Sequence, residues 1–194
     1  LSGNSRDPLT GRDLDGDEMP GPADQAVADE EWAWLNTTLA ASKADFIVVS
    51  GHFPVWSVCE HGPTGNLVAK LKPVLEHFHV SAYLSGHDHC EEHIDDSKGL
   101  GPQYHVIGAA NQNQGSHKHK SSVPADEVKF LDIGTVPGLS EVQGGFASLT
   151  FTGGANASLV VKHYRTSPIG HRTMYTAAPI HKRAPAVPTL LKNN

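Results

Sequence analysis

The chain has 194 residues, of which 38% are hydrophobic and 19% are charged, and its formal net charge at pH 7 is −6. This length is sufficient for one domain with its own hydrophobic core. The acidic balance argues against general nucleic-acid binding, and without a run of about 18 apolar residues the sequence predicts no membrane span. The 13 histidines point instead to metal ligation or proton transfer.

The N-terminal part divides into an acidic loop and a helix. Residues 1–23 are rich in Gly, Pro and Asp and show no apolar periodicity, which predicts an exposed loop. Asp24 is a suitable N-cap for a helix that extends to about Ser42. The predicted apolar face of this helix consists of Val27, Trp34, Leu35 and Leu39.

The middle of the chain alternates between strands and a helix. Asp45–His52 is a short apolar run that predicts a buried strand ending in Gly-His. Gly65–His77 has the core stripe of a helix, which Pro73 should kink or end early. The segment "VSAYLSGHDH" repeats the pattern of strand, Gly and His, and Gln103–Asn113 predicts a third strand.

The C-terminal part is predicted to be antiparallel. Residues 114–142 look irregular, and they contain the basic run "SHKHK". Two alternating strands follow at Gly145–Thr152 and Ser158–Arg165, joined by the turn "GGAN". A last strand at Thr173–Ala178 precedes a Pro-rich tail. Together these elements predict an α/β fold with a mixed sheet and flanking helices.

Two neighbouring strands that each end in Gly-His would bring His52, His87 and His89 to one sheet edge. Ligands gather at the carboxyl ends of strands in open α/β sheets, and neutral imidazole is a common ligand for zinc and iron. On an extended stretch His87 and His89 share a face and Asp88 is turned away, whereas on a turn the two rings could reach two adjacent ions. We therefore predict a metal site at this edge.

Glu60-His61 lies in a Gly/Pro loop beyond the first strand. A histidine there could donate a proton to a leaving group, with Glu60 tuning it, or it could be a structural loop histidine. The role of His93 is left open. The remaining histidines are expected to be ordinary hydrogen-bonded or surface residues: His77, His79, His105, His117, His119, His163, His171 and His181.

Several of these segments resemble a known family. "GHFPVWSVCEHGPTG", "AYLSGHDH" and "GGFASLTF" are similar to the tartrate-resistant type of purple acid phosphatase, a branch of the calcineurin-like metallophosphoesterases. "WAWLNTTLAASKADFIVVSGH" also resembles the helix and strand that precede the first motif in that family. The likeness extends over most of residues 1–165 and fades beyond them.

The resemblance implies a four-layer α/β/β/α sandwich of which this chain is the C-terminal half. It implies a binuclear centre of Fe(III) with Fe(II) or Zn(II), in which His52 and His87 bind the divalent ion and His89 binds the ferric ion. His61 matches the acid that protonates the leaving group, with Glu60 as its acidic neighbour. The implied reaction is hydrolysis of phosphomonoesters at acid pH by a metal-activated hydroxide.

The family's remaining ligands, which include the GDxxY-type and GNHE-type motifs, have no counterpart in this sequence. We therefore expect the chain to be inactive alone and to need an N-terminal portion of the same precursor. Residues 1–23 would be the regulatory-loop equivalent, 24–165 the C-terminal part of the domain, and 166–194 the final strand and tail. The alternative is a non-catalytic phosphatase-fold glycoprotein that serves as a structural or binding subunit.

The cysteines and the N-glycosylation sequons indicate the cellular compartment of the protein. Cys59 and Cys90 flank the two histidine motifs and either pair with one another or remain buried thiols. Asn36 and Asn156 lie in sequons, which permit N-glycans in a secretory compartment. With the family resemblance, these features predict a secreted protein or one of the lysosomal or vacuolar lumen.

Overall fold

The structure is a computed structural model that describes residues 25–96, 101–110, 113, 115–134, 144–167 and 170–183. The predicted acidic loop 1–23 and the Pro-rich tail lie outside the described residues. The elements in chain order are α1 (Gln25–Ala41), β1 (Val48–Ser50), α2 (Gly65–His77), β2 (Ala82–Ser85), β3 (Glu91–Ile94), β4 (Gln103–Ile107), β5 (Val128–Asp132), β6 (Gly145–Thr152), β7 (Ser158–Ser167), β8 (Gly170–Thr176) and β9 (Ile180–His181).

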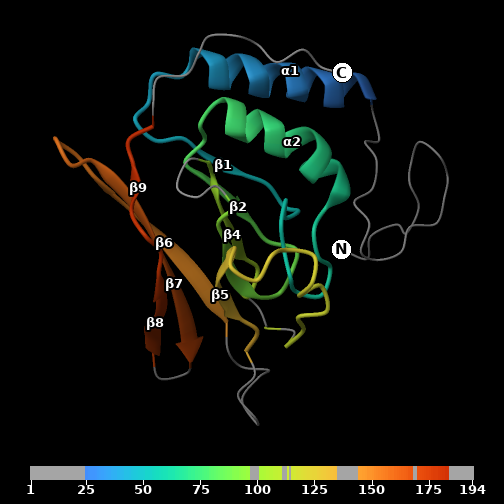
Figure 1. Cartoon of the computed structure of the whole chain (residues 1–194), viewed down its shortest axis with the longest axis vertical. Coiled ribbons are helices and arrows are strands. Elements are labelled where there is room, and N and C mark those ends of the chain that lie inside the picture. The colour runs from blue at the N-terminus through green and yellow to red at the C-terminus, as the bar shows by residue number, and fades with distance from the viewer. Residues whose placement is uncertain are drawn as a thin grey trace.

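The first sheet has the strand order β1-β2-β4-β3-β5. β1, β2 and β4 are parallel to one another, as the three predicted strands require, while β3 is antiparallel to both β4 and β5. The helices α1 and α2 lie side by side against this sheet (Figure 1). The predicted mixed sheet with flanking helices is therefore confirmed.

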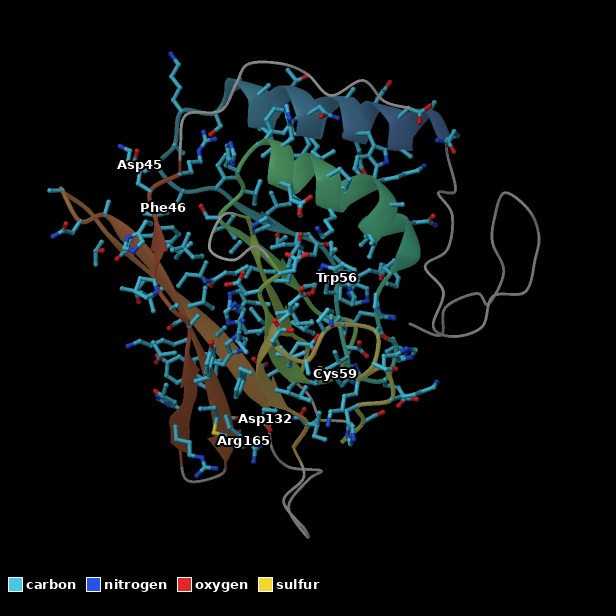
Figure 2. The ribbon with its side chains drawn as sticks, viewed as in Figure 1. Asp45, Phe46, Trp56, Cys59, Asp132 and Arg165 are labelled. Carbon is cyan, nitrogen blue, oxygen red and sulfur yellow. A yellow bond between two sulfur atoms is a disulfide. The ribbon has the colours of Figure 1, made fainter. Side chains whose placement is uncertain are left out.

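The second sheet is an antiparallel meander of β6, β7 and β8, with β9 added beside β7. It lies across the first sheet on the side away from the helices (Figure 1). Asp132 of β5 and Arg165 of β7 form an ion pair where the two sheets meet (Figure 2). The C-terminal strands thus pack as a layer of their own.

The predicted apolar face of α1 is partly wrong. Leu39 is buried, but Val27 and Trp34 are 52% and 65% exposed, while Trp32 packs against the core instead. Residues at positions 28, 32, 35 and 39 share one helix face because they follow the 3.6-residue period. Val27 and Trp34 lie off that face.

The middle of the chain agrees with the predictions for α2 but not for two strands. α2 has the predicted bounds and continues through Pro73, so this residue does not end the helix early, and Leu71, Val74 and Leu75 on either side of it are buried in the core. β3 was not predicted, since its sequence "EEHI" is mostly polar, yet every residue in it is buried. β5 lies within the stretch that was predicted to be irregular, and it forms by pairing with β3.

Histidines fill the space between the two sheets, where they act as hydrogen-bonded core residues. The His163 ring is held between Glu91 Oε2 at 2.6 Å and His105 Nδ1 at 3.0 Å. His93 stacks on the His105 ring at 4.3 Å between centroids and contacts the Tyr175 hydroxyl at 3.0 Å. The structural role predicted for His105 and His163 is confirmed, and His93 belongs to the same cluster.

The buried His93 and His105 are expected to make the protein less stable at acid pH. Burial lowers the pKa of His93 from 6.5 to about 4 and lowers the pKa of His105 well below its usual value. The unfolded chain then binds protons at a higher pH than the folded one. From His93 alone, the free energy of unfolding should fall by on the order of 3 kcal/mol between pH 6.5 and pH 4.

Thermal unfolding measured across this pH range checks the expectation. His93→Gln removes the titrating group while keeping a polar side chain, so its stability should depend less steeply on pH below about 6.5 than that of the wild type. Equal pH dependence in both proteins would contradict the assignment.

Candidate metal and acid–base site

The two Gly-His strand ends meet as predicted. The Gly51 N–H donates to the Leu84 carbonyl at 3.0 Å, and the Gly86 N–H donates to the His52 carbonyl at 3.0 Å. These bonds continue the parallel pairing of β1 with β2 past the ends of the strands. As a result, Nε2 of His52 and Nδ1 of His87 lie 3.3 Å apart.

The Gly86–Cys90 segment is a turn rather than an extended stretch. His87 adopts a left-handed backbone conformation with φ 66°, which is uncommon for a residue with a side chain and marks a constrained site. Gly108 packs directly behind this turn, since a Cβ there would lie 1.7 Å from the Asp88 carbonyl oxygen. Of the two predicted geometries, the turn is the one observed.

The surroundings of His87 keep its imidazole neutral. Burial lowers the pKa of His87 to about 4, and the neighbouring His61 and His52 lower it further. Its Nε2 atom is buried and has no hydrogen-bond partner among the described residues. A neutral ring is the form in which histidine binds metals, and the nitrogen that His87 presents to His52 is Nδ1 rather than this Nε2.

The distance between the His52 and His87 nitrogens also suits two ligands of one metal ion. Two imidazole nitrogens bound to one tetrahedral zinc at about 2.0–2.1 Å are separated by roughly 3.3 Å. The His52 and His87 nitrogens lie 3.3 Å apart. This pair therefore fits as two ligands of a single divalent ion.

His89 lies on the same turn but is not in that pair. Its ring is close enough to lower the pKa of His87. Its carbonyl oxygen accepts a hydrogen bond at 2.9 Å from the Asn113 side-chain amide, once the amide is oriented to suit its neighbours. In the described part of the chain, His52, His87 and His89 thus do not form a convergent group of three ligand atoms.

Among the described ranges, the one convergent group of three potential ligand side chains is Cys59, Cys90 and Glu92. It cannot provide thiolate ligands, because the two cysteines form a disulfide. This settles which of the two predicted states the cysteines adopt. The bond joins the His61 loop to the His87 turn, and both cysteines are buried.

His61 lies beside the histidine pair. Its ring centroid is 4.4 Å from that of His87. The neighbouring Glu60 is half-buried, with its carboxylate 3.8 Å from the Lys118 ammonium. His87 thus contacts the rings of both His52 and His61, whereas the contact made by Glu60 is with Lys118.

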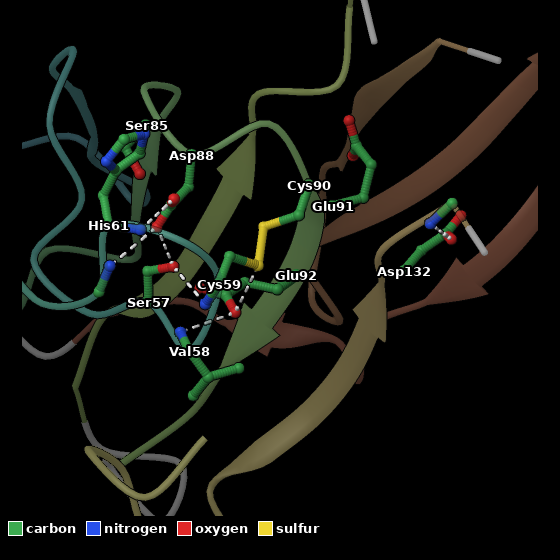
Figure 3. The surroundings of a disulfide bond; sticks show 12 residues. Ser57, Val58, Cys59, His61, Ser85, Asp88, Cys90, Glu91, Glu92 and Asp132 are labelled. Carbon is green, nitrogen blue, oxygen red and sulfur yellow. Dashed lines mark hydrogen bonds between the residues drawn. A yellow bond between two sulfur atoms is a disulfide. The ribbon is translucent and has the colours of Figure 1, made fainter. Parts of the chain in front are cut away.

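Asp88 has a role that the sequence analysis missed. It was expected to turn away on an extended stretch, but its side chain is fully buried. Its carboxylate accepts hydrogen bonds from the Ser57 hydroxyl at 2.5 Å and from the N–H groups of His61 and Gly62 at 2.8 and 3.2 Å (Figure 3). No local sequence signal links residues 88 and 57–62.

The basic run at 116–120 was also not expected near the site. The His119 N–H donates to the Val58 carbonyl at 3.2 Å, and the His119 ring packs so closely on Gly62 that a Cβ there would lie 2.5 Å from it. Gly62 also has φ 75°, which favours glycine. His119 of this run therefore packs directly against the loop that carries His61.

Sequence comparisons agree with the predicted resemblance. Residues 3–91 match the model of the calcineurin-like phosphoesterase family. The chain is 40% identical over 152 residues to tartrate-resistant acid phosphatase type 5 of Oryctolagus cuniculus, covering 78% of this chain and 43% of the relative. Against the Homo sapiens protein of the same name it is 40% identical over 147 residues, covering 76% and 41%. The chain spans less than half the length of these curated relatives.

Two other comparisons are consistent with these. Purple acid phosphatase 17 of Arabidopsis thaliana is 40% identical over 62 residues, which are 32% of this chain and 18% of that protein. A solved structure described as "GAP50 the anchor in the inner membrane complex of Plasmodium" superimposes with a TM-score of 0.65 at 22% identity, covering 84% of this chain and 45% of that one. This likeness concerns the fold.

None of the helices in the described part of the chain is long and apolar enough to cross a membrane. The parallel strands that end in Gly-His, the paired histidines and the sequence matches lead to one assignment. Residues 3–91 belong to the calcineurin-like phosphoesterase family, and the chain is related to the tartrate-resistant and purple acid phosphatases.

Proposed function

We propose that the chain supplies part of the active site of a metal-dependent phosphatase that hydrolyses phosphomonoesters. The observation that carries this proposal is the contact between Nε2 of His52 and Nδ1 of His87, with the His61 ring tilted against the His87 ring at 4.4 Å between centroids. This arrangement combines two candidate metal ligands with a candidate proton donor at the end of a parallel sheet.

The proposed ligand roles follow the chemistry of the side chains. His52 and His87 hold a divalent ion, Fe(II) or Zn(II), and His89 on the same turn reaches a ferric ion beside it. A metal pair of this kind acts as a Lewis acid toward the phosphate and acidifies bound water. Fe(III) favours hard oxygen ligands, and these are to be supplied from outside this chain.

His61 is the proposed general acid. It lies within ring contact of His87 and not in the ligand pair, so it can face the leaving-group oxygen of a phosphate bound at the metals. Protonating that oxygen is needed most when the leaving group is a poor one. Glu60, which precedes His61 in the chain and lies 3.8 Å from the Lys118 ammonium, is proposed to adjust the charge around His61.

The missing ligands are proposed to come from an N-terminal portion of the same precursor. β1 is an edge strand of the described sheet, and beside it a groove of about 800 Å³ runs between α1, α2 and β1. The exposed Trp34 lines this groove. A further strand or helix packed there would cover this apolar surface and reach the carboxyl end of the sheet where His52 lies.

The proposed environment is the secretory pathway, in line with the buried disulfide. The burial of Asn36 argues against a glycan at that sequon. Asn36 is 5% exposed on α1, and its Nδ2, where a glycan would attach, donates to the Trp32 carbonyl at 3.2 Å. Asn156 lies exposed in the turn between β6 and β7 and remains the proposed site.

The function is tested on the protein purified in its native form. Intact mass spectrometry combined with metal analysis should find a second segment that carries the missing ligands and about two metal ions per active site, together with acid phosphomonoesterase activity. A lone chain of 20.7 kDa without bound metal or activity would favour the alternative, a phosphatase-fold binding subunit.

The acid role of His61 predicts a specific kinetic signature. In the complete enzyme, His61→Ala should retain both metals and lower kcat/KM by roughly 100-fold or more for esters with poor leaving groups. Esters with good leaving groups should be slowed much less. An equal loss for both kinds of ester would refute the assignment.

A further inference from the structure

The His61 loop, residues 57–62, is bound by three residues that follow His87, namely Asp88, Cys90 and Glu92. The Asp88 carboxylate binds both ends of the loop, Cys90 is bonded to Cys59, and Glu92 Oε2 accepts the Val58 N–H at 3.2 Å. In the 88–92 segment, Asp88 and Cys90 lie on the turn and Glu92 lies on β3, and the contacts show that all three side chains face the loop.

The alternate residues of this segment face elsewhere. Glu91 binds His163 of β7, and His93 contacts Tyr175 of β8, so both point into the space between the two sheets. The segment thus holds the candidate site with one face and packs against the second sheet with the other. The contacts of Asp88, Cys90 and Glu92 with the His61 loop therefore form a set separate from the contacts of Glu91 and His93 with the second sheet.

Within this set, Asp88 makes the contacts nearest to His61. Its carboxylate binds the backbone N–H of His61 itself and that of the next residue, Gly62. The third donor, the Ser57 hydroxyl, comes from the start of the same loop. Two N–H donors and a hydroxyl around one fully buried carboxylate are charge-assisted bonds, the stronger class of hydrogen bond.

The partners on the other side of Asp88 are equally fixed. Asp88 lies between His87 and His89, and Gly108 packs against its backbone from behind. A short side chain on a constrained turn has little freedom to move. The same turn that presents the candidate ligands therefore also determines where the His61 backbone lies.

We propose that Asp88 is a positioning residue for the general acid, which it holds in register with the metal ligands on its own turn. This rests on the proposed function of His61. Asp88 touches neither the substrate nor the reacting atoms, and it acts through the backbone of the loop. A displacement of about 1 Å in a reacting group can cost roughly 100-fold in rate. Loss of the Asp88 contacts should therefore slow the reaction by moving His61.

Asp88→Asn in the complete enzyme is the test. The asparagine retains the size of the side chain but turns one acceptor into an amide that faces N–H donors, so at least one bond to the loop is lost. Metal content should be unchanged. We expect kcat/KM to fall roughly 10- to 100-fold for poor leaving groups and clearly less for good ones, with faster hydrogen–deuterium exchange in the 57–62 segment.

Asp132→Asn is the matched control. Asp132 is also a buried carboxylate, but its side chain binds Arg165 and the Gly134 N–H rather than the His61 loop. Its loss should lower thermal stability without altering the ratio of rates between poor and good leaving groups, and without faster exchange in residues 57–62.

Three results would overturn the positioning role. They are an equal loss for all leaving groups in Asp88→Asn, unchanged exchange in the 57–62 segment, and loss of metal from the variant. If the wild type itself shows no phosphatase activity, the proposed function fails. The exchange measurement then still decides whether Asp88 holds the loop.

Discussion

Replacing His87 with alanine in the complete protein is expected to abolish phosphatase activity and to release the divalent ion. Nδ1 of His87 faces Nε2 of His52 at 3.3 Å, so its removal leaves a single imidazole at that position. Losing even a residue that only orients a ligand typically costs 10–100-fold in metal affinity or activity. We expect a larger loss here, measured as metal per protein and as kcat/KM.

His79→Ala is the control for this substitution. Of the non-glycine residues in the described ranges, His79 and His87 are the two with positive φ, at 51° and 66°. Alanine at either position therefore introduces the same kind of backbone strain, but His79 follows α2 and is no candidate ligand. His87→Asn adds a second comparison, because asparagine tolerates this conformation. If His87→Asn retained the metal and full activity, the ligand role would be wrong.

His163→Ala is expected to be strongly destabilising. The ring is fully buried between Glu91 and His105, and the pKa of Glu91 is already raised by burial. Removing the histidine leaves this acid without its partner and opens a cavity between the sheets. Breaking a buried pair from one side costs about 3–5 kcal/mol, which corresponds to a fall in Tm of roughly 6–20 °C.

A double-mutant cycle with Glu91→Gln distinguishes the two causes of this loss. If the unpaired acid dominates, the double variant should be more stable than His163→Ala alone, because glutamine carries no charge to bury. As a surface control, His171→Ala on β8 removes an exposed ring and should change stability by less than about 0.5 kcal/mol. A loss for His163→Ala as small as this control would contradict the structural role of the cluster.

The sequence predicted much of the fold because local patterns determined the elements. α2 has the predicted bounds, and the strand at Gly145–Thr152 coincides with β6. The two Gly-His pairs predicted that His52 and His87 lie close together, since parallel strands place their carboxyl ends at one edge of the sheet. Polar β3 could not be predicted in this way, because its residues are buried by partners from other strands.

By itself, the sequence determined the candidate ligands, the candidate acid and the family, because each depends on residue types at short spacing. The tertiary structure alone decided that Asp88 grips the His61 loop, that Cys59 bonds to Cys90, and which side of α1 is covered. These contacts join residues that are far apart in the chain. Such residues meet only after the sheets have packed, and no periodicity along the chain records which of them will face one another.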